Sequence, residues 1–317
     1  LSLGGVLGGQ TGNAFGNWNE FAILLGLLTV LGIALCRTEA AQGLWGYLFG
    51  AVSLISALFL IFANFFYVWT AVGIAGLIAI LAQHLASRSQ SGNPAFQLGT
   101  KRVWIALVVL ALFFMLFGSL VANVLPSRIR VANIEARPSL QGTIAIGQQS
   151  LTEPSSLFFG AGPNTFSREW GLYKPVSINQ SDYWNTNFTS GAGTIPTSFV
   201  TTGIFGIIAW ILFALALIVA AGRALVRYGK GEQGNPYAPS FGIASAFLFS
   251  FYVLYVPGPA LSTIVFLSIG LFVAFSAQAG LTGTHHVTLR GNGWKGTAAI
   301  AGLVFFGLVT VLACIGI

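Results

Sequence analysis

Charged residues are scarce in this chain, and their scarcity excludes a soluble globular domain. Only 7% of the 317 residues are charged, whereas 55% are hydrophobic. A soluble domain carries about 25% charged residues, because it needs a polar surface in water. The chain instead holds repeated apolar runs of about 20 residues, the length that crosses a hydrocarbon core of ~30 Å. These runs predict transmembrane helices, since a membrane barrel would show strands of about 10 residues with alternating hydrophobicity.

Cysteine and histidine are also rare, which argues against several kinds of site. Cys36 and Cys314 lie in or beside separate apolar runs. Thiols behave as small apolar packing residues in such surroundings, so these two predict neither a disulfide nor a metal pair. His285 and His286 are adjacent, but no further ligand accompanies them, and a solvated loop is the better interpretation. We therefore expect no metal and no cofactor.

The apolar runs predict an all-α polytopic transmembrane bundle of about eight spans. One long polar segment, residues 126–197, separates four spans in residues 1–125 from four in residues 198–317. We expect this segment to be a large extracytoplasmic loop that contains short amphipathic helices. Because the chain starts at Leu1 and ends inside an apolar stretch, we also expect it to be a fragment of a longer protein. The predicted spans are residues 20–36, 44–62, 66–86, 103–125, 198–222, 239–256, 259–280 and 297–317.

The distribution of charge predicts the orientation of these spans. If the loops after the first, third, fifth and seventh spans share one side, that side holds nine basic and two acidic residues, whereas the other side holds five of each. Cytoplasmic loops carry the excess of Lys and Arg, so the loop 126–197 lies outside. The net charge of +7 is thus spread over short loops, and no basic patch predicts a nucleic-acid partner. No charge lies at a bilayer centre, which disfavours an ion-coupled transporter.

The long loop has its own local patterns. Residues 138–151 predict a short amphipathic helix that starts with Pro138 at its first position. The glycine-rich segment 160–164 predicts a tight turn. Thr165 or Asn164 is expected to cap a second short helix that follows this turn.

Three motifs follow one another in a fixed order in and after this loop. Arg137 precedes the first short helix, the turn Gly160-Ala-Gly-Pro-Asn-Thr-Phe166 comes next, and Phe199-Val-Thr-Thr-Gly203-Ile-Phe-Gly206 leads into an apolar span. This ordered set resembles the O-antigen ligase and O-antigen polymerase family of polytopic membrane glycosyltransferases. The resemblance covers roughly residues 137–210, together with the general pattern of spans.

The resemblance implies a bacterial inner-membrane enzyme that transfers or polymerises an undecaprenyl-diphosphate-linked glycan outside the cytoplasmic membrane. Its partners would be membrane lipid, this glycan donor and an acceptor of unknown identity. The position of Arg137 implies diphosphate binding, with Arg168 and Lys174 assisting. Arginine presents a planar fork to phosphate oxygens, and a departing diphosphate needs its developing charge stabilised. The alternative for Arg137 is an interfacial side chain attracted to lipid headgroups.

One departure from the family concerns the general base. The family carries a His-Asn pair about ten residues before the Thr-Gly-Ile motif, whereas residues 190–196 of this chain contain no histidine. A carboxylate would then have to accept the proton of the acceptor hydroxyl, and Asp182 and Glu169 are the candidates. A turn position for Asp182 and a solvated helix charge for Glu169 are the alternatives.

Aromatic residues of the loop suggest contact with sugar rings. Trp170, Tyr173, Tyr183 and Trp184 combine apolar faces with polar tips, which suits carbohydrate. Packing of the loop onto the bundle is the alternative. The second hypothesis for function is a non-catalytic relative that binds lipid or glycan or assists assembly, and a transporter is the third.

Overall fold

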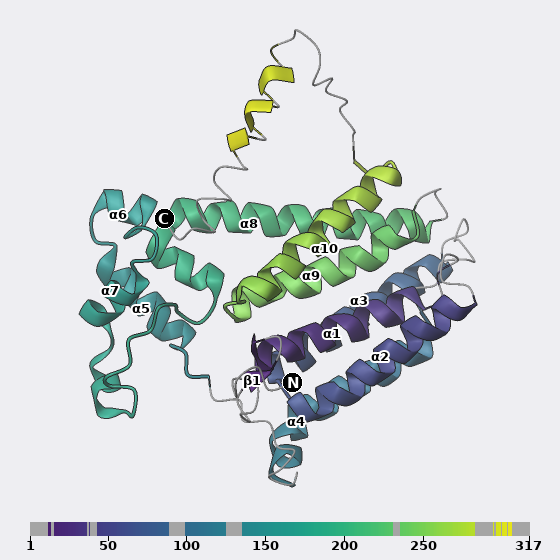
Figure 1. Ribbon diagram of the computed structural model, residues 1–317, viewed down its shortest axis with the longest axis horizontal. Helices are drawn as coiled ribbons and strands as arrows, with labels where there is room; N and C mark the ends of the chain where they lie inside the picture. Colours follow the sequence, from purple (N-terminus) through teal and green to yellow (C-terminus); the bar gives the residue numbers. More distant parts are fainter. Residues whose placement is uncertain are drawn as a thin grey trace. The chain divides into compact units, whose positions relative to one another are not determined.

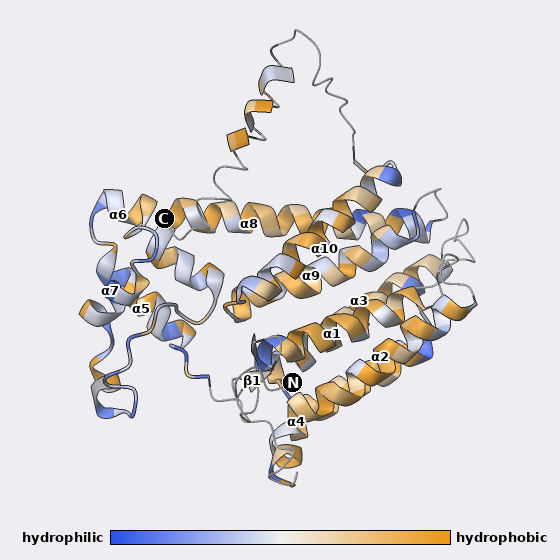
Figure 2. Ribbon diagram, viewed as in Figure 1, coloured by the Kyte–Doolittle hydropathy of each residue, from blue (hydrophilic) through white to orange (hydrophobic). Residues whose placement is uncertain are grey.

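The described part of the chain is dominated by seven long apolar helices, which confirms the prediction of a helical membrane bundle. Each is long and apolar enough to cross a membrane, and Figure 2 shows them mainly in orange. The computed structural model describes residues 12, 13, 16–36, 38, 43–88, 99–124, 135–230, 235–282, 294, 296–298, 300–302, 304 and 305. The seven helices are α1 (Trp18–Leu35), α2 (Leu44–Ala63), α3 (Phe66–Arg88), α4 (Lys101–Val124), α8 (Thr194–Gly229), α9 (Tyr237–Leu254) and α10 (Pro259–Gln278).

The seven helices correspond one to one with the first seven predicted spans, and the eighth prediction is only partly covered. Of residues 297–317, the structure describes seven positions up to residue 305, and the rest lies outside the described residues. The chain divides into residues 1–281 and 282–317, and the helices considered below belong to the first unit. Figure 1 labels them in chain order.

Helix α8 is longer than the predicted span 198–222. It runs for 36 residues with a kink at Gly203, and the part after the kink, residues 204–229, is by itself about 39 Å long at 1.5 Å per residue, which exceeds a ~30 Å hydrocarbon core. The sequence pattern underestimates it because the apolar run ends near Arg223, whereas the helix continues through residues whose long side chains can reach the polar interface. Gly203 interrupts the helix with φ 65° and ψ −158°, a conformation that is essentially restricted to glycine.

Two tight turns join neighbouring helices where the sequence predicts them. Asn64 ends α2 in the left-handed region, and its side-chain Nδ2 donates a hydrogen bond of 2.6 Å to the carbonyl of Gly118 in α4. The turn between α9 and α10 is held by Glu20 of α1, whose Oε1 accepts 2.9 Å from the backbone N–H of Gly258. Both contacts tie a hairpin to a third helix, so they fix helix packing as well as the turns.

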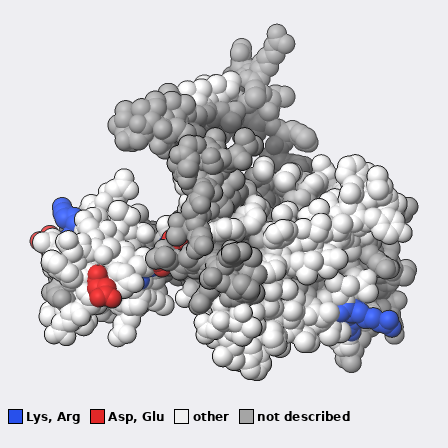
Figure 3. Space-filling model, turned by 60° about the horizontal axis from the view of Figure 1, so that its bottom comes forward, with Lys and Arg blue, Asp and Glu red and all other residues white. Residues whose placement is uncertain are grey.

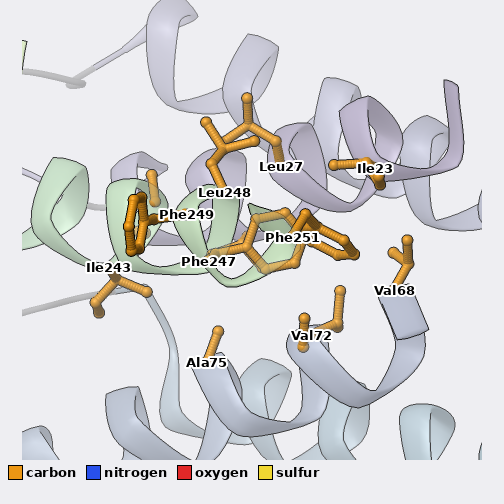
Figure 4. Close-up of a cluster of buried hydrophobic side chains, with 14 of the residues drawn as sticks. Ile23, Leu27, Val68, Val72, Ala75, Ile243, Phe247, Leu248, Phe249 and Phe251 are labelled. Carbon is orange, nitrogen blue, oxygen red and sulfur yellow. The ribbon is translucent and has the colours of Figure 1, made fainter. Parts of the chain in front are cut away.

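The main core of the bundle lies where α1, α3 and α9 meet. Figure 4 shows side chains from these three helices, including Ile23 and Leu27, Val68 and Val72, and a run of aromatic residues from α9. Val68, Val72 and Phe251 are completely buried. Gly26 allows this close approach, because a Cβ there would lie 2.7 Å from Val68 and 2.8 Å from Phe247. Small residues at such crossings are typical of helix packing in lipid.

The segment between α4 and α8 folds into short helices, as predicted for the loop. These are α5 (Leu140–Ser150), α6 (Pro154–Phe159), α7 (Phe166–Tyr173) and the 3₁₀ helix η3 (Val176–Gln180). The expected place of Pro138 is wrong: α5 begins at Leu140, because the Ser139 hydroxyl caps it by accepting from the Gly142 N–H at 3.0 Å. Thr165 is the N-cap residue of α7, as expected, although its side chain makes no capping bond.

A small ladder of β1 (Gly12–Asn13) and β2 (Gly16–Asn17) precedes α1.

Candidate functional site

The short helices of the loop are attached to the first part of α8. Gly147 of α5 faces Phe199 so closely that a Cβ would lie 2.5 Å from its ring. Beside this contact, Ile146, Phe166, Trp170 and Val200 form a small buried core that joins α5, α7 and α8. The loop is thus a folded layer with its own apolar interior, and side chains placed on it are held in position.

Two of the three motifs behind the family resemblance lie against each other. The backbone N–H of Ala161 donates 2.8 Å to the Val200 carbonyl, and that of Gly162 donates 3.0 Å to the Thr201 carbonyl. The kink at Gly203 makes room for this turn, because a Cβ there would lie 2.6 Å from the Gly160 nitrogen. The glycines of both motifs therefore allow the two backbone segments to approach closely and to form hydrogen bonds with each other.

A cavity of about 740 Å³ lies between the segment that precedes α5, α5 itself, and the η3 region. This volume falls in the range of small-molecule sites. The lining combines charged and polar side chains with aromatic rings. Its lining includes Glu135, Arg137, Gln141, Gln149, Trp170, Tyr183 and Phe188. In Figure 3 charged side chains are few, and most of the visible described surface is white.

Arg137 is anchored at the edge of this cavity by several contacts. Its Nε donates 2.9 Å to Glu135 Oε1, and its Nη2 forms an ion pair with the same oxygen. The guanidinium carbon lies 4.0 Å from the centre of the Tyr255 ring, which is a cation–π contact. The side chain is 20% exposed. Arg137 is therefore oriented before any ligand arrives.

Glu135 is held by partners from two other parts of the chain. Its Oε2 accepts 2.6 Å from the Tyr255 hydroxyl and 2.9 Å from Asn19 Nδ2. Burial acts to raise the pKa of Glu135, but the hydrogen bonds from Tyr255, Asn19 and Arg137 outweigh it and hold the pKa below its usual range. The carboxylate is thus ionised at neutral pH and balances the charge of Arg137.

Tyr255 keeps its proton in this arrangement. Burial raises the pKa of its phenol, and the neighbouring Glu135 carboxylate raises it further. The hydroxyl also accepts 3.0 Å from Asn17 Nδ2. Tyr255 is consequently a neutral donor that links the end of α9 to the start of α1 and to the loop.

One hydrogen-bond donor of the Arg137 guanidinium lacks a partner in the described part of the chain. Its Nη1 is buried and has no hydrogen-bond partner among the described residues. An unpaired buried donor is costly, and a ligand oxygen would satisfy it. Because Glu135 already occupies the other side of the guanidinium, Nη1 is the donor of Arg137 that remains for an anion, which would reach it once the groups that bury this atom move.

The other predicted diphosphate ligands lie elsewhere. Arg168 donates 2.9 Å and 2.7 Å to Glu169 Oε1 from its Nε and Nη2. Lys174 donates 2.5 Å to the Trp184 carbonyl. Neither residue is in the cavity lining with Arg137. The structure therefore does not bring the three predicted cations together.

The two predicted carboxylates are also separate from Arg137. Glu169 is 3% exposed and paired with Arg168, and Asp182 is exposed near the η3 helix. Neither lines the cavity, whereas Glu135 does. The carboxylate beside Arg137 is thus Glu135, which is not one of the two predicted from the sequence. The Glu-x-Arg spacing at 135–137 is the only local signal for it.

The four predicted stacking residues fall into two groups. Trp170 is 2% exposed, donates 3.0 Å from Nε1 to the Thr186 carbonyl and meets the Phe188 ring edge-on, while Tyr173 is half-buried against the same small core. Tyr183 and Trp184 are exposed. Trp170 and Tyr183 line the cavity, but only Tyr183 is exposed, so it is the predicted stacking residue placed to meet a ligand beside Arg137.

The fold and this site define a multi-pass helical membrane protein with several short helices between α4 and α8. No family model, curated protein or solved structure matches the chain.

Proposed function

We propose that this protein is a membrane glycosyltransferase of the O-antigen ligase and polymerase type. Its donor would be an undecaprenyl-diphosphate-linked glycan, and it would work at the outer face of the bacterial cytoplasmic membrane. The observation that carries the proposal is Arg137, which is fixed by Glu135 and Tyr255 at a cavity of about 740 Å³ and has a buried Nη1 without a partner.

The chemistry of this cavity suits a lipid-linked glycan. A guanidinium with a free donor can bind a diphosphate oxygen and stabilise the charge that develops as the diphosphate leaves. Tyr183, which is exposed, offers an aromatic face to a sugar ring in the same lining. Gln141 and Gln149, from α5, supply amide groups for sugar hydroxyls. The contact between the turn at 160–162 and the residues before Gly203 adds support, because it joins two of the motifs that carry the resemblance.

A non-catalytic glycan-binding role is the second candidate, and Glu135 favours it. Both oxygens of this carboxylate are engaged, one by Arg137 and the other by Tyr255 and Asn19. Glu135 is the one carboxylate among the described residues of the lining. A base must be able to reach the acceptor hydroxyl, so catalysis requires Glu135 to exchange one of these partners for the acceptor.

The proposal is tested by replacing Arg137 in the source organism. Arg137→Ala should abolish the transfer of glycan to the cell surface and cause the lipid-linked intermediate to accumulate, as deletion of the gene should. Arg168→Ala is the matched control, since it also removes an arginine that pairs with a carboxylate but lies outside the cavity lining. Both variants should insert at normal levels. Normal surface glycan in an inserted Arg137→Ala strain would exclude the enzymatic role.

The second candidate gives a different result in the same strains. A binding protein would retain glycan transfer after loss of Arg137 but lose affinity for the lipid-linked glycan. Binding of the purified lipid-linked glycan to the reconstituted protein, measured without an acceptor, therefore separates the two functions.

A further inference from the structure

An apolar groove runs along α3 and α8 and continues onto α9. It consists of two cavities of about 370 and 240 Å³ whose linings share Ile78, Gly222 and Leu225. On α3 the linings extend from Ala71 to Ala86, a distance of about 22 Å at 1.5 Å per residue. One leaflet of a ~30 Å hydrocarbon core is about 15 Å thick. The groove is therefore long enough to hold one chain of a lipid from a single leaflet.

Missing side chains on α8 create this groove. Gly222 lines both cavities, and a Cβ placed on it would meet no atom within 4 Å. Glycine lowers helix stability by about 1 kcal/mol relative to alanine. Gly222 therefore does not stabilise α8. The space at Gly222 is open because nothing in the described part of the unit fills it.

The groove has a charged end. Lys230, at the C-terminus of α8, lines the larger cavity and is the one charged residue among the described residues of the two linings. It is exposed and has no ion-pair partner within the described parts of the chain. A basic side chain at the end of an apolar groove is complementary to an anionic lipid, with its phosphate at the interface and its chain in the hydrocarbon.

We propose that this groove binds a diacyl phospholipid with an anionic headgroup. One acyl chain would lie beside Ile78, Gly222 and Leu225, and its phosphate would pair with Lys230. This site is distinct from the Arg137 cavity, which is built from the loop and shares no lining residue with the groove. The proposal therefore stands independently of glycan transfer.

The full chain in nanodiscs of phosphatidylglycerol and phosphatidylethanolamine in equal amounts provides the test. A trace of photoreactive phosphatidylglycerol should label peptides of α3 and α8. Gly222→Leu should reduce this labelling to background, because the new side chain would occupy the groove, and its Cβ would meet no atom within 4 Å. Lys230→Gln should lower the preference for phosphatidylglycerol over phosphatidylethanolamine by about fivefold, the effect of one basic group at the interface.

Two controls match these variants. Gly50→Leu also adds a side chain where a Cβ would meet nothing within 4 Å, but on α2 and outside the groove. Lys101→Gln removes an exposed lysine at the start of α4. Neither should change the labelling. If Gly222→Leu fails to insert, Lys230→Gln still decides the question.

Two results would overturn the proposal. One is labelling of α3 and α8 that is unchanged in both Gly222→Leu and Lys230→Gln. The other is a photoreactive amino acid at position 225 that cross-links to protein, either within the chain or in a second copy, and gives no lipid adduct.

Discussion

The hydroxyl of Tyr255 lies 2.6 Å from Oε2 of Glu135, although 120 residues separate the two in the sequence. This bond connects the end of α9 with the segment that leads into α5. The ring of the same tyrosine covers the guanidinium of Arg137. One side chain thus orients both members of the ion pair at the cavity, and the predictions for this site start from it.

Tyr255→Phe should lower the free energy of unfolding by about 1.5–3 kcal/mol at neutral pH, the value of a hydrogen bond to a charged group. The phenyl ring keeps its contact with Arg137, so the change removes only the hydroxyl, with its bonds to Glu135 and Asn17. Thermal unfolding of the purified protein in detergent measures the effect. Tyr67→Phe is the control, because the Tyr67 hydroxyl makes no hydrogen bond among the described residues; an equal loss in both variants would contradict the role of the Glu135 bond.

The same pair predicts a dependence on pH. The folded protein holds the pKa of Glu135 below its ordinary value of 4.5. The resulting stabilisation is complete above pH 4.5 and is lost as the pH falls through the lowered pKa. In Tyr255→Phe the pKa of Glu135 moves back toward its ordinary value, so the loss of stability on acidification should be smaller and should end at a higher pH than in the wild type. Unfolding temperatures between pH 3 and pH 7 measure this shift, and Glu135→Gln should remove the contribution of this group.

Gly203→Ala should destabilise the junction between the loop and α8. The backbone at Gly203 has a positive φ, and a Cβ would lie 2.6 Å from both the Gly160 nitrogen and the Leu157 carbonyl oxygen. Strain of this kind costs of order 1–3 kcal/mol, and the clash adds to it. Limited proteolysis should cut the loop faster than in the wild type. Gly222→Ala, at a helical position with free space, should leave the rate unchanged.

The membrane helices are predictable from the sequence because each depends on a local property, a continuous apolar run of sufficient length. The turns at Asn64 and Gly258 follow from equally local signals. The kink in α8 does not, because Gly203 is one of several glycines and its special conformation is set by the turn at 160–162. The sequence pattern also ends α8 too early, since helix geometry continues past the point where apolar residues stop.

The site is only partly predictable for a similar reason. Arg137 stands out by its position before an amphipathic helix, and the cavity does contain it. The groups that hold Glu135, its ion-pair partner, cannot be inferred, because Tyr255 and Asn19 lie at the ends of distant helices that meet the loop only after folding. The family resemblance groups Arg168, Lys174 and Asp182 with Arg137, whereas in the structure Arg168 pairs with Glu169.

The two tryptophans proposed for stacking should behave differently when replaced. Trp170→Ala should destabilise the loop by about 3–5 kcal/mol, because it empties a buried position and leaves the Thr186 carbonyl without its donor. Trp184→Ala should leave the unfolding temperature unchanged, since that ring is 59% exposed. Trp184 does not line the cavity, so its loss should also leave the affinity for the lipid-linked glycan unchanged. Weaker binding at unchanged stability would extend the glycan site beyond the cavity to Trp184.

The side of the membrane on which the loop lies decides whether the proposed donor can reach the cavity. Single cysteines test it after Cys36 and Cys314 are replaced by alanine. Asp182→Cys, in the exposed part of the loop, should react with a membrane-impermeant maleimide in cells with a permeabilised outer membrane. Lys230→Cys, at the far end of α8, should react only after the cytoplasmic membrane is lysed, because the excess of basic residues assigns it to the cytoplasm. The reverse pattern would place Arg137 in the cytoplasm, and a glycan displayed on the outer leaflet could then not be its substrate.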